Sequence, residues 1–185
     1  MSLAREAGVN LEFINHELLP ALKSGEYKQG FGRLRANEEE IDFRPLGPPR
    51  SNEEEKRMCC LGVACDVKDK EGWVVVRSTY NQFHWTHQLS DSGGLVLRDL
   101  DWLFGTMPQQ ILSIINDYGQ EMKPAYDYEH VIIVLEHLEN DLLYNDLTRE
   151  FSKITIPNTN NEKVYEKFGA IVENLQKGVY DEQSI

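Results

Sequence analysis

The chain has 185 residues, a mass of 21.4 kDa and a formal net charge of −12 from 19 basic and 31 acidic residues. A chain of this length buries about 70% of its unfolded surface, so one domain forms without a disulfide or a metal. The acidic balance argues against direct binding of nucleic acid or of anionic membranes, because both need a basic protein surface. The apolar content of 41% argues against a disordered chain.

The cysteines and the N-terminus bear on the cellular compartment. Cys59, Cys60 and Cys65 are odd in number, two of them are adjacent, and all lie in an apolar stretch, which is typical of buried reduced thiols. They do not form the paired CxxC motifs of a zinc site. The first residues contain no signal-peptide core, and no run approaches the roughly 18 apolar residues of a membrane span. We expect a cytoplasmic protein that needs no metal or cofactor.

The first predicted element is a helix over residues 9–24. Apolar residues recur there at helical spacing: Leu11, Ile14, Leu18 and Leu22. Asn10 is a suitable N-cap, and Gly25 is a suitable stop after the last turn. Pro20 lies inside the pattern and predicts a kink, because proline lacks the N–H that the helix needs.

Two irregular segments follow this helix. Residues 26–35 are punctuated by glycines and predict a loop or a short hairpin. Residues 36–57 contain two runs of three glutamates around a proline-rich centre. This composition is typical of a mobile acidic insertion between two structured pieces.

The middle of the chain predicts one buried element and a small sheet. Residues 58–67 are apolar almost all round, which fits either a buried helix or a buried strand; we favour the helix. Residues 73–98 are rich in β-branched and aromatic side chains and contain turn residues, which predicts a small antiparallel sheet.

Three helices are predicted in the C-terminal half. The first follows a capping-box pattern at Thr106–Gln109, the second is a long helix from about residue 127, and the third begins near 162 and stops at Gly178. The side chains expected to face inward are Ile111, Leu112, Ile114 and Ile115; Val131, Val134, Leu135, Leu138, Leu142 and Leu143; and Val164, Phe168, Val172 and Leu175.

Taken together, these elements predict the α+β class: a helix-dominated single domain with a small central antiparallel sheet. We expect a compact domain over residues 1–150, with the acidic insertion at about 36–57 projecting from it. Residues 151–185 are expected to form a helical extension packed on the same domain. The apolar helix faces also allow packing against a second copy, so a homodimer is a further expectation.

Two phosphate-directed motifs fail on inspection. Residues 25–32 contain GxxxxG, but Phe31 and Gly32 stand where a P-loop needs a lysine and a hydroxyl residue. His84 and Thr86 form one HxT element, yet two-histidine phosphodiesterases need a second one as the partner acid or base, and none is present.

The spacing of the histidines does not favour a metal site. His84, His87 and Asp91 need a turn between them, because strand positions three apart point to opposite faces. His130 and His137 lie seven residues apart on a predicted helix, without the i, i+4 spacing of a zinc helix, and a solvated helix face explains them better.

The unusual local feature is a basic, glycine-rich segment in an acidic chain. Between Lys23 and Arg35 four cations and one anion give a net charge of +3. Arginine can grip phosphate bidentately, aromatic rings can stack on a base, and glycine permits close approach of a ligand. The candidate ligand-binding residues are Tyr27, Lys28, Gln29, Phe31, Arg33 and Arg35. The alternative, that these cations pair with the acidic insertion, stays open.

The sequence also resembles a family of small, mostly uncharacterised bacteriophage proteins. The resemblance rests on ALKSGEYKQGFGRLR (21–35) followed by CCLGVACD (59–66), with weaker pieces in DWLFG (101–105), IINDYG (114–119) and AYDYEHVIIVLEHLE (125–139). The chain departs from the family in its long acidic insertion, in Ala64 where leucine is usual, and in its extension after about residue 150. The resemblance implies a phage origin and a host-cytoplasm location, and it transfers no catalytic residues.

Three functions compete at this point. The first is an anti-defence factor that sequesters a small nucleotide-type host signalling molecule without catalysis. Lys28, Arg33 and Arg35 would neutralise its phosphate. Gln29 would hydrogen-bond the base or ribose, and Tyr27 or Phe31 would stack on the base. The second is an acidic interaction inhibitor, or nucleic-acid mimic, that blocks a host defence protein. The third is a metal- or histidine-dependent nucleotide hydrolase built on His84 and His87. The sequence favours a protein without catalytic activity.

Overall fold

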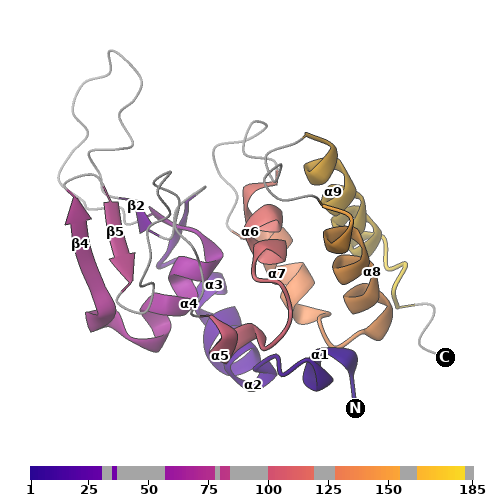
Figure 1. The fold of residues 1–185 in the computed structure, drawn as a ribbon, viewed down its shortest axis with the longest axis horizontal. Helices are drawn as coiled ribbons and strands as arrows, with labels where there is room; N and C mark the ends of the chain where they lie inside the picture. The colour runs from indigo at the N-terminus through magenta and orange to yellow at the C-terminus, as the bar shows by residue number, and fades with distance from the viewer. Residues whose placement is uncertain are drawn as a thin grey trace.

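The computed structural model describes residues 1–30, 35–36, 57–77, 80–83, 100–118, 128–154 and 162–181. Helices dominate this part of the chain (Figure 1). They are α1 (Leu3–Glu6), α2 (Leu11–Phe13), the π-helix η1 (Ile14–Leu18), α3 (Leu19–Lys23), α4 (Cys60–Lys68), the 3₁₀ turn η3 (Lys70–Gly72), α5 (Asp101–Phe104), α6 (Gln110–Asp117), α7 (Glu129–Glu136), α8 (Asp141–Ser152) and α9 (Glu162–Gln176). The strands are β1 (Lys28–Gln29), β2 (Arg35–Ala36), β3 (Arg57–Met58), β4 (Trp73–Arg77) and β5 (Tyr80–Phe83).

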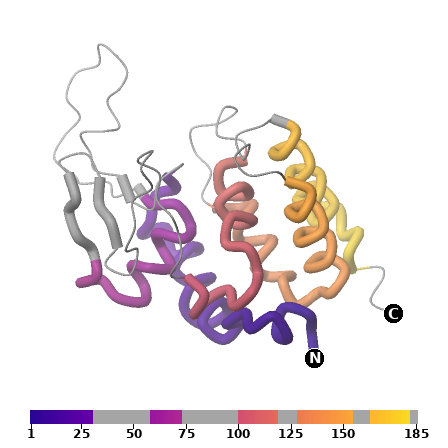
Figure 2. The backbone as a smooth tube through the Cα atoms, viewed as in Figure 1, coloured from indigo at the N-terminus to yellow at the C-terminus, as the bar shows by residue number. Residues whose placement is uncertain are grey.

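The core of the protein is built by helices. Helix α9 packs against α6, α7 and α8, and α4 packs against α3 and α6. The tube in Figure 2 shows the N-terminal helices running beneath this group, so that the N-terminus lies near the start of α8. Tyr128, Phe104 and Phe168 are among the largest side chains that are fully buried between these helices. Ion pairs from Arg5 to Glu139 and from Lys23 to Glu136 tie the N-terminal helices to α7 and the turn after it.

The strands form a mixed sheet in the order β1-β3-β2-β5-β4, at the opposite end of the molecule from α8 and α9 (Figure 1). Strands β1 and β3 pair in parallel, and the other pairings are antiparallel. The predicted small central antiparallel sheet is therefore wrong. The β-branched pattern of 73–98 gave no information on where its strands lie in the fold. The helices bury their apolar faces against one another instead of against a sheet. The hairpin alternative for 26–35 is wrong as well, because β1 and β2 lie on either side of β3 rather than beside each other.

The predicted N-terminal helix is confirmed over residues 11–23, with its apolar residues buried. The side chain of Asn10 accepts a hydrogen bond from the Phe13 N–H at 3.0 Å, which caps the helix. Ahead of Pro20 the helix widens into η1, where the Leu19 N–H reaches back to the carbonyl of Ile14. This wider turn gives the proline ring room and spares the missing N–H.

The apolar segment at 58–67 forms helix α4, so the helical alternative is confirmed. Its three cysteines are buried and free. Burial raises the pKa of the Cys59 thiol from 9.0 to about 12, and it also raises the pKa of the Cys60 thiol. These thiols therefore stay protonated and pack as small apolar side chains.

Two predictions in the C-terminal half are wrong. Thr106 does not cap α6; its hydroxyl donates to the Ala7 carbonyl at 3.2 Å, and the helix begins four residues later at Gln110. The long helix from residue 127 is two helices, α7 and α8, with a new N-cap at Asn140. Leu142, expected to face inward, is consequently 40% exposed.

The last helix agrees with its prediction, since α9 buries its apolar residues and the chain turns at Gly178. The other inward residues predicted for α6 are buried too. Residues 37–56, which make up almost all of the predicted acidic insertion, lie outside the described residues. The predicted division at residue 150 stays a prediction. Among the described helices, none has the length and apolar character needed to cross a membrane.

Candidate functional site

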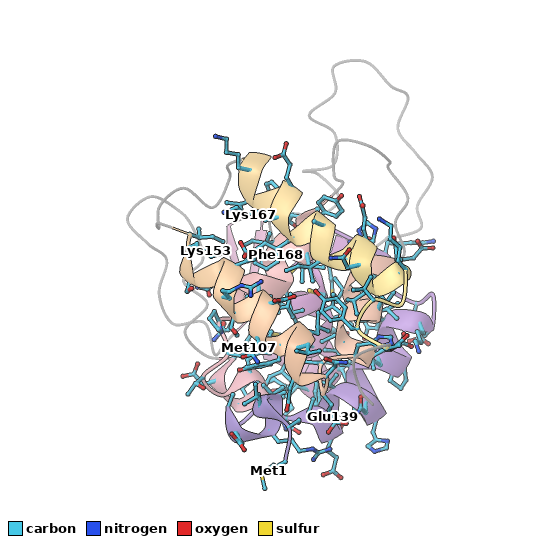
Figure 3. All side chains as sticks on the ribbon, turned by 90° about the vertical axis from the view of Figure 1, so that its right-hand side faces the viewer. Met1, Met107, Glu139, Lys153, Lys167 and Phe168 are labelled. Carbon is cyan, nitrogen blue, oxygen red and sulfur yellow. The ribbon has the colours of Figure 1, made fainter. Side chains whose placement is uncertain are left out.

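An open groove of about 740 Å³ lies along the outer face of α8, against the end of α9 and the turn that follows it. Figure 3 shows α8 and α9 side by side on this face of the molecule. The groove is lined by Leu142, Asn145, Asp146, Thr148, Arg149, Ser152, Asn174, Val179 and Tyr180. Its volume falls within the range of roughly 300–1,000 Å³ that small-molecule sites occupy.

Helical spacing explains how α8 supplies one wall of the groove. Leu142, Asn145, Asp146 and Arg149 recur at three and four residues, so they share one outward face. Leu143 and Leu147 occupy the opposite face and are buried. Asn140 caps α8 as a separate helix. The side of α8 that faces outward therefore does not follow from the side of α7 that faces outward.

The turn after α9 supplies the other wall. Gly178 has φ +71°, a left-handed conformation that favours glycine. The Val179 N–H bonds to the Asn174 carbonyl at 3.0 Å, and the Gly178 N–H bonds to the Leu175 carbonyl at 3.0 Å. This pair of bonds is a Schellman motif, which reverses the chain at a helix end. It returns Val179 and Tyr180 to the side of α8, where Asn140 donates to the Tyr180 carbonyl at 3.1 Å.

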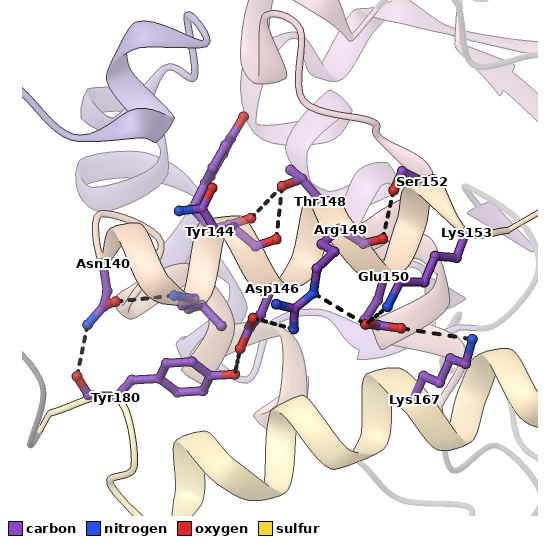
Figure 4. A network of polar contacts seen from close by, with 12 residues as sticks. Asn140, Tyr144, Asp146, Thr148, Arg149, Glu150, Ser152, Lys153, Lys167 and Tyr180 are labelled. Atoms are coloured by element: carbon purple, nitrogen blue, oxygen red, sulfur yellow. Dashed lines mark hydrogen bonds and ion pairs between the residues drawn. The ribbon is translucent and has the colours of Figure 1, made fainter.

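A continuous polar network starts in the groove and continues beside it along α8 (Figure 4). The Tyr180 hydroxyl donates to Asp146 at 3.0 Å, and Arg149 pairs with Asp146 at 2.7 Å and with Glu150 at 3.6 Å. Lys153 lies 2.6 Å and Lys167 3.9 Å from Glu150. The network links α8 to α9 and to the turn that follows α9.

The pKa values along this network follow from its contacts. Burial, and then the hydrogen bond to Asp146, raise the pKa of Tyr180 to about 12. The hydrogen bond from Lys153 lowers the pKa of Glu150. At neutral pH the Tyr180 hydroxyl is therefore protonated and donates to Asp146, and Glu150 is an anion.

The lining of the groove is close to neutral. Among its lining residues, the carboxylate of Asp146 pairs with the guanidinium of Arg149 at 2.7 Å. The ion pairs of Glu150 with Lys153 and Lys167 lie beside the groove, between α8 and α9. Figure 3 shows these two lysines together, away from Glu139 in the turn before α8.

Two apolar side chains are exposed in the groove, one near the start of α8 and one in the turn after α9. Leu142 and Val179 are each 40% exposed, and Met1 is the one other large hydrophobic residue in the described ranges with such exposure. Leu142 comes from α8 and Val179 from the turn after α9, so separate segments bring them to one groove. Single exposed apolar residues are ordinary, but a pair inside one groove forms a small contact surface.

Of the ligand-binding residues predicted from the sequence, the first three are described. The Tyr27 hydroxyl donates to Asp66 at 2.8 Å, and burial followed by that bond raises its pKa. Lys28 is exposed, while Gln29 is buried. Lys23, at the start of the basic segment, pairs with Glu136 of α7.

The other three predicted residues are not characterised by the structure. Phe31 and Arg33 lie outside the described residues, and Arg35 is described only through its backbone pairing in β2. The predicted ligand site therefore stays a prediction. The same holds for His84, His87 and Asp91, which also lie outside the described ranges.

Gln29 belongs to a buried hydrogen-bonded cluster centred on Asn116. The Gln29 amide donates to the Asn116 carbonyl at 3.0 Å and accepts from the Tyr128 N–H at 3.1 Å. The side chain of Asn116 accepts from the Cys60 N–H at 3.0 Å and donates to the Gly30 carbonyl at 2.9 Å. The cluster joins β1, α4, α6 and the residue that precedes α7. Both ends of the Gln29 amide are used inside the protein.

The two histidines of α7 and its end are half-buried and engaged. His130 lies beside Tyr118, with ring centroids 5.3 Å apart, and burial lowers its pKa. His137 Nδ1 is 2.9 Å from the Ile133 carbonyl oxygen, and its Nε2 is 4.0 Å from Asp181. Within the described ranges, no three histidine, cysteine or acidic side chains are grouped to hold a metal.

Sequence reasoning missed the groove because it placed Leu142 on an inward stripe. The available signal was Asn140 followed by Asp141, a capping pair inside a long apolar repeat. Comparison with protein-family models, curated proteins and solved structures gave no match. The geometry thus defines a helical protein with a preorganised, polar groove that exposes two apolar side chains.

Proposed function

We propose that the protein is a non-catalytic binding protein that attaches this groove to another protein. The observation that carries the proposal is the pair Leu142 and Val179, which are exposed together on one groove. Removing exposed apolar surface from water is the main favourable term in protein association. The polar residues between them already bond to one another, so binding would cost little ordering of side chains.

The charge of the protein supports a partner with a basic surface. A net charge of −12 speeds the approach of a basic protein and discourages an acidic one. This function corresponds to the interaction inhibitor among the three functions weighed from the sequence. The resemblance to phage proteins extends the proposal: the partner would be a host defence protein in the bacterial cytoplasm.

The test is capture of partners from bacterial lysate by the tagged full-length chain. Wild type is compared with Leu142→Ser/Val179→Ser, which removes apolar surface without changing charge. The matched control is Asn15→Ser/His16→Ser, which alters two exposed positions on η1. We expect wild type and the control to retain a partner that the groove variant loses. Equal capture by all three proteins would refute the groove as the binding surface.

Nucleotide sequestration stays a prediction that a separate measurement decides. Calorimetric titration of wild type with a panel of signalling nucleotides would detect it, and Lys28→Ala would report on the exposed cation of the predicted site. Heat from a nucleotide that Lys28→Ala abolishes would favour sequestration over protein binding.

A further inference from the structure

Resting on the proposed function, we infer that the groove takes an uncharged helical segment of the partner, in which one large apolar side chain is followed by amide and hydroxyl side chains. The apolar side chain lies between Leu142 and Val179, and the uncharged polar side chains lie along α8. The inference concerns the chemistry of the segment that enters the groove, which the proposed function leaves open. Any basic surface of the partner stays outside the groove.

The first step of the argument is the position of the two apolar side chains. The side chain of Asn140 accepts from the Leu142 N–H at 3.0 Å and donates to the Tyr180 carbonyl at 3.1 Å. Leu142 and Val179, the residue before Tyr180, therefore lie at the same end of the groove, and each is exposed. A large apolar side chain placed between them covers both and removes their surface from water.

The second step is that the charged groups of the lining already have partners. Asp146 accepts from the Tyr180 hydroxyl through Oδ2 at 3.0 Å and pairs with Nη2 of Arg149 through Oδ1 at 2.7 Å. A partner lysine would compete with Arg149 for Asp146, and a partner glutamate would compete with Asp146 for Arg149. Either would leave one charge without its counter-ion inside the contact, so the groove disfavours a charged segment of either sign.

The third step concerns the uncharged polar groups along α8. The Thr148 hydroxyl donates to the Tyr144 carbonyl at 2.9 Å, and the Ser152 hydroxyl donates to the Arg149 carbonyl at 2.7 Å. Their protons are used within α8, while their oxygens can still accept a hydrogen bond. The exposed amide of Asn145 can both donate and accept. Amide and hydroxyl side chains of a partner satisfy these groups without bringing a charge.

The fourth step is the length and the composition of the groove walls. The lining residues from Leu142 to Ser152 follow α8 over about 15 Å of its axis. A partner helix laid beside α8 can keep contact over this length with its own backbone groups already bonded. An extended segment would find helices and a turn here, because the sheet lies at the opposite end of the molecule (Figure 1).

A second copy of the chain fits the groove less well. Each copy carries the same net charge of −12, so two copies repel one another, and a nearly neutral lining offers no attraction to offset this. If the α8 helices of two copies met, each would also bring a charged Asp146–Arg149 pair into the groove of the other. A different protein that supplies an uncharged segment is the better occupant.

The test uses three labelled helical peptides and the full-length chain. The first carries a leucine followed on the same face by glutamine and serine, and the other two have lysine or glutamate in place of the glutamines. Binding is measured by fluorescence anisotropy. We expect the glutamine peptide to bind wild type with a Kd that changes less than about twofold between about 0.05 and 0.5 M salt. The lysine and glutamate peptides should each bind about tenfold more weakly than the glutamine peptide.

Two variants of matched charge separate local pairing from general electrostatics. Arg149→Gln removes the counter-ion of Asp146, so the lysine peptide should bind this variant about tenfold more tightly than it binds wild type. Arg5→Gln makes the same change in charge at an exposed arginine that also pairs with a carboxylate, that of Glu139. It should alter the binding of the lysine peptide less than about twofold. Circular dichroism checks the folding of both variants, and the comparison of the three peptides on wild type does not depend on them.

Each other outcome overturns the inference. Tighter binding of the lysine or the glutamate peptide to wild type would mean that the groove selects a charge, and equal effects of the two arginine variants would mean non-specific attraction. Failure of all three peptides, or full binding of the glutamine peptide by Leu142→Ser/Val179→Ser, would also refute it. Self-association in sedimentation that Leu142→Ser removes would make a second copy the occupant. In all these cases lysate capture with the serine variants still decides the proposed function separately.

Discussion

At the scale of single residues, the side chain of Asn140 has two structural roles. Its side-chain oxygen accepts from the N–H groups of Leu142 at 3.0 Å and Leu143 at 3.2 Å, and its amide donates to the Tyr180 carbonyl. The first contact starts α8, and the second fixes the turn that forms the opposite wall of the groove. The cap and the groove therefore depend on one side chain.

We expect Asn140→Ala to lower the free energy of unfolding by about 1–2 kcal/mol, because both the cap and the link to Tyr180 are lost. Asn140→Ser keeps a capping oxygen and loses only the amide donor, so its cost should be clearly smaller. Urea denaturation of the three proteins measures both values. Equal losses in the two variants would show that the link, and not the cap, carries the effect.

Residue-level expectations succeeded where the cause was local. Asn10 caps its helix and Gly178 turns the chain as their sequence positions indicate. The burial of Gln29 was not predicted, because its partners lie 87 and 99 residues away along the chain. Periodicity and composition describe neighbours in sequence, so they gave no information on these long-range contacts.

At the scale of elements, the contact between α6 and α9 depends on a glycine. A Cβ placed on Gly169 would lie within 2.4 Å of two ring carbons and the hydroxyl oxygen of Tyr118, the residue that ends α6. The glycine therefore lets the Tyr118 ring lie close against α9, at the cost of a residue that is unfavourable inside a helix.

This contact predicts that Gly169→Ala has opposite effects on stability in wild type and in a Tyr118→Ala variant. In wild type, Gly169→Ala should destabilise the protein by about 1–3 kcal/mol, because the added methyl group overlaps the Tyr118 ring. In a Tyr118→Ala background the space is free, and the same change should stabilise by about 0.5–1 kcal/mol through helix propensity. Thermal or urea unfolding of wild type, the two single variants and the double variant gives the four stabilities of a double-mutant cycle. The same effect in both backgrounds would rule out the overlap.

Element predictions held for long, strongly periodic segments and failed at junctions. Helix α9 follows its apolar repeat, whereas α7 and α8 share a repeat that continues across a break at Asn140. The sheet was misplaced for a related reason: strands β1, β2 and β3 have two residues each, too few for alternation to show. For the candidate site, the sequence indicated the stop at Gly178, but it did not indicate that Leu142 faces outward after the break at Asn140.

At the scale of the whole molecule, three buried thiols couple folding to pH. The pKa of Cys59 rises from 9.0 to about 12, and the pKa values of Cys60 and Cys65 are also raised, in each case first through burial. Above about pH 9 the thiols of the unfolded chain ionise, while those of the folded chain remain protonated. Ionisation then favours the unfolded chain.

The stability that these thiols provide is therefore fully present below pH 9 and lost as pH rises toward the folded-state pKa values. Each thiol should reduce the free energy of unfolding by up to about 1.4 kcal/mol per pH unit above pH 9. Urea denaturation at quarter-unit steps from pH 8 to about pH 9.5 measures this slope below the ordinary tyrosine pKa of about 10. Cys65→Ala removes one titrating group, so its slope should be shallower by about a third even though its stability at pH 8 is lower. An unchanged slope in that variant would show that other groups set the alkaline limit.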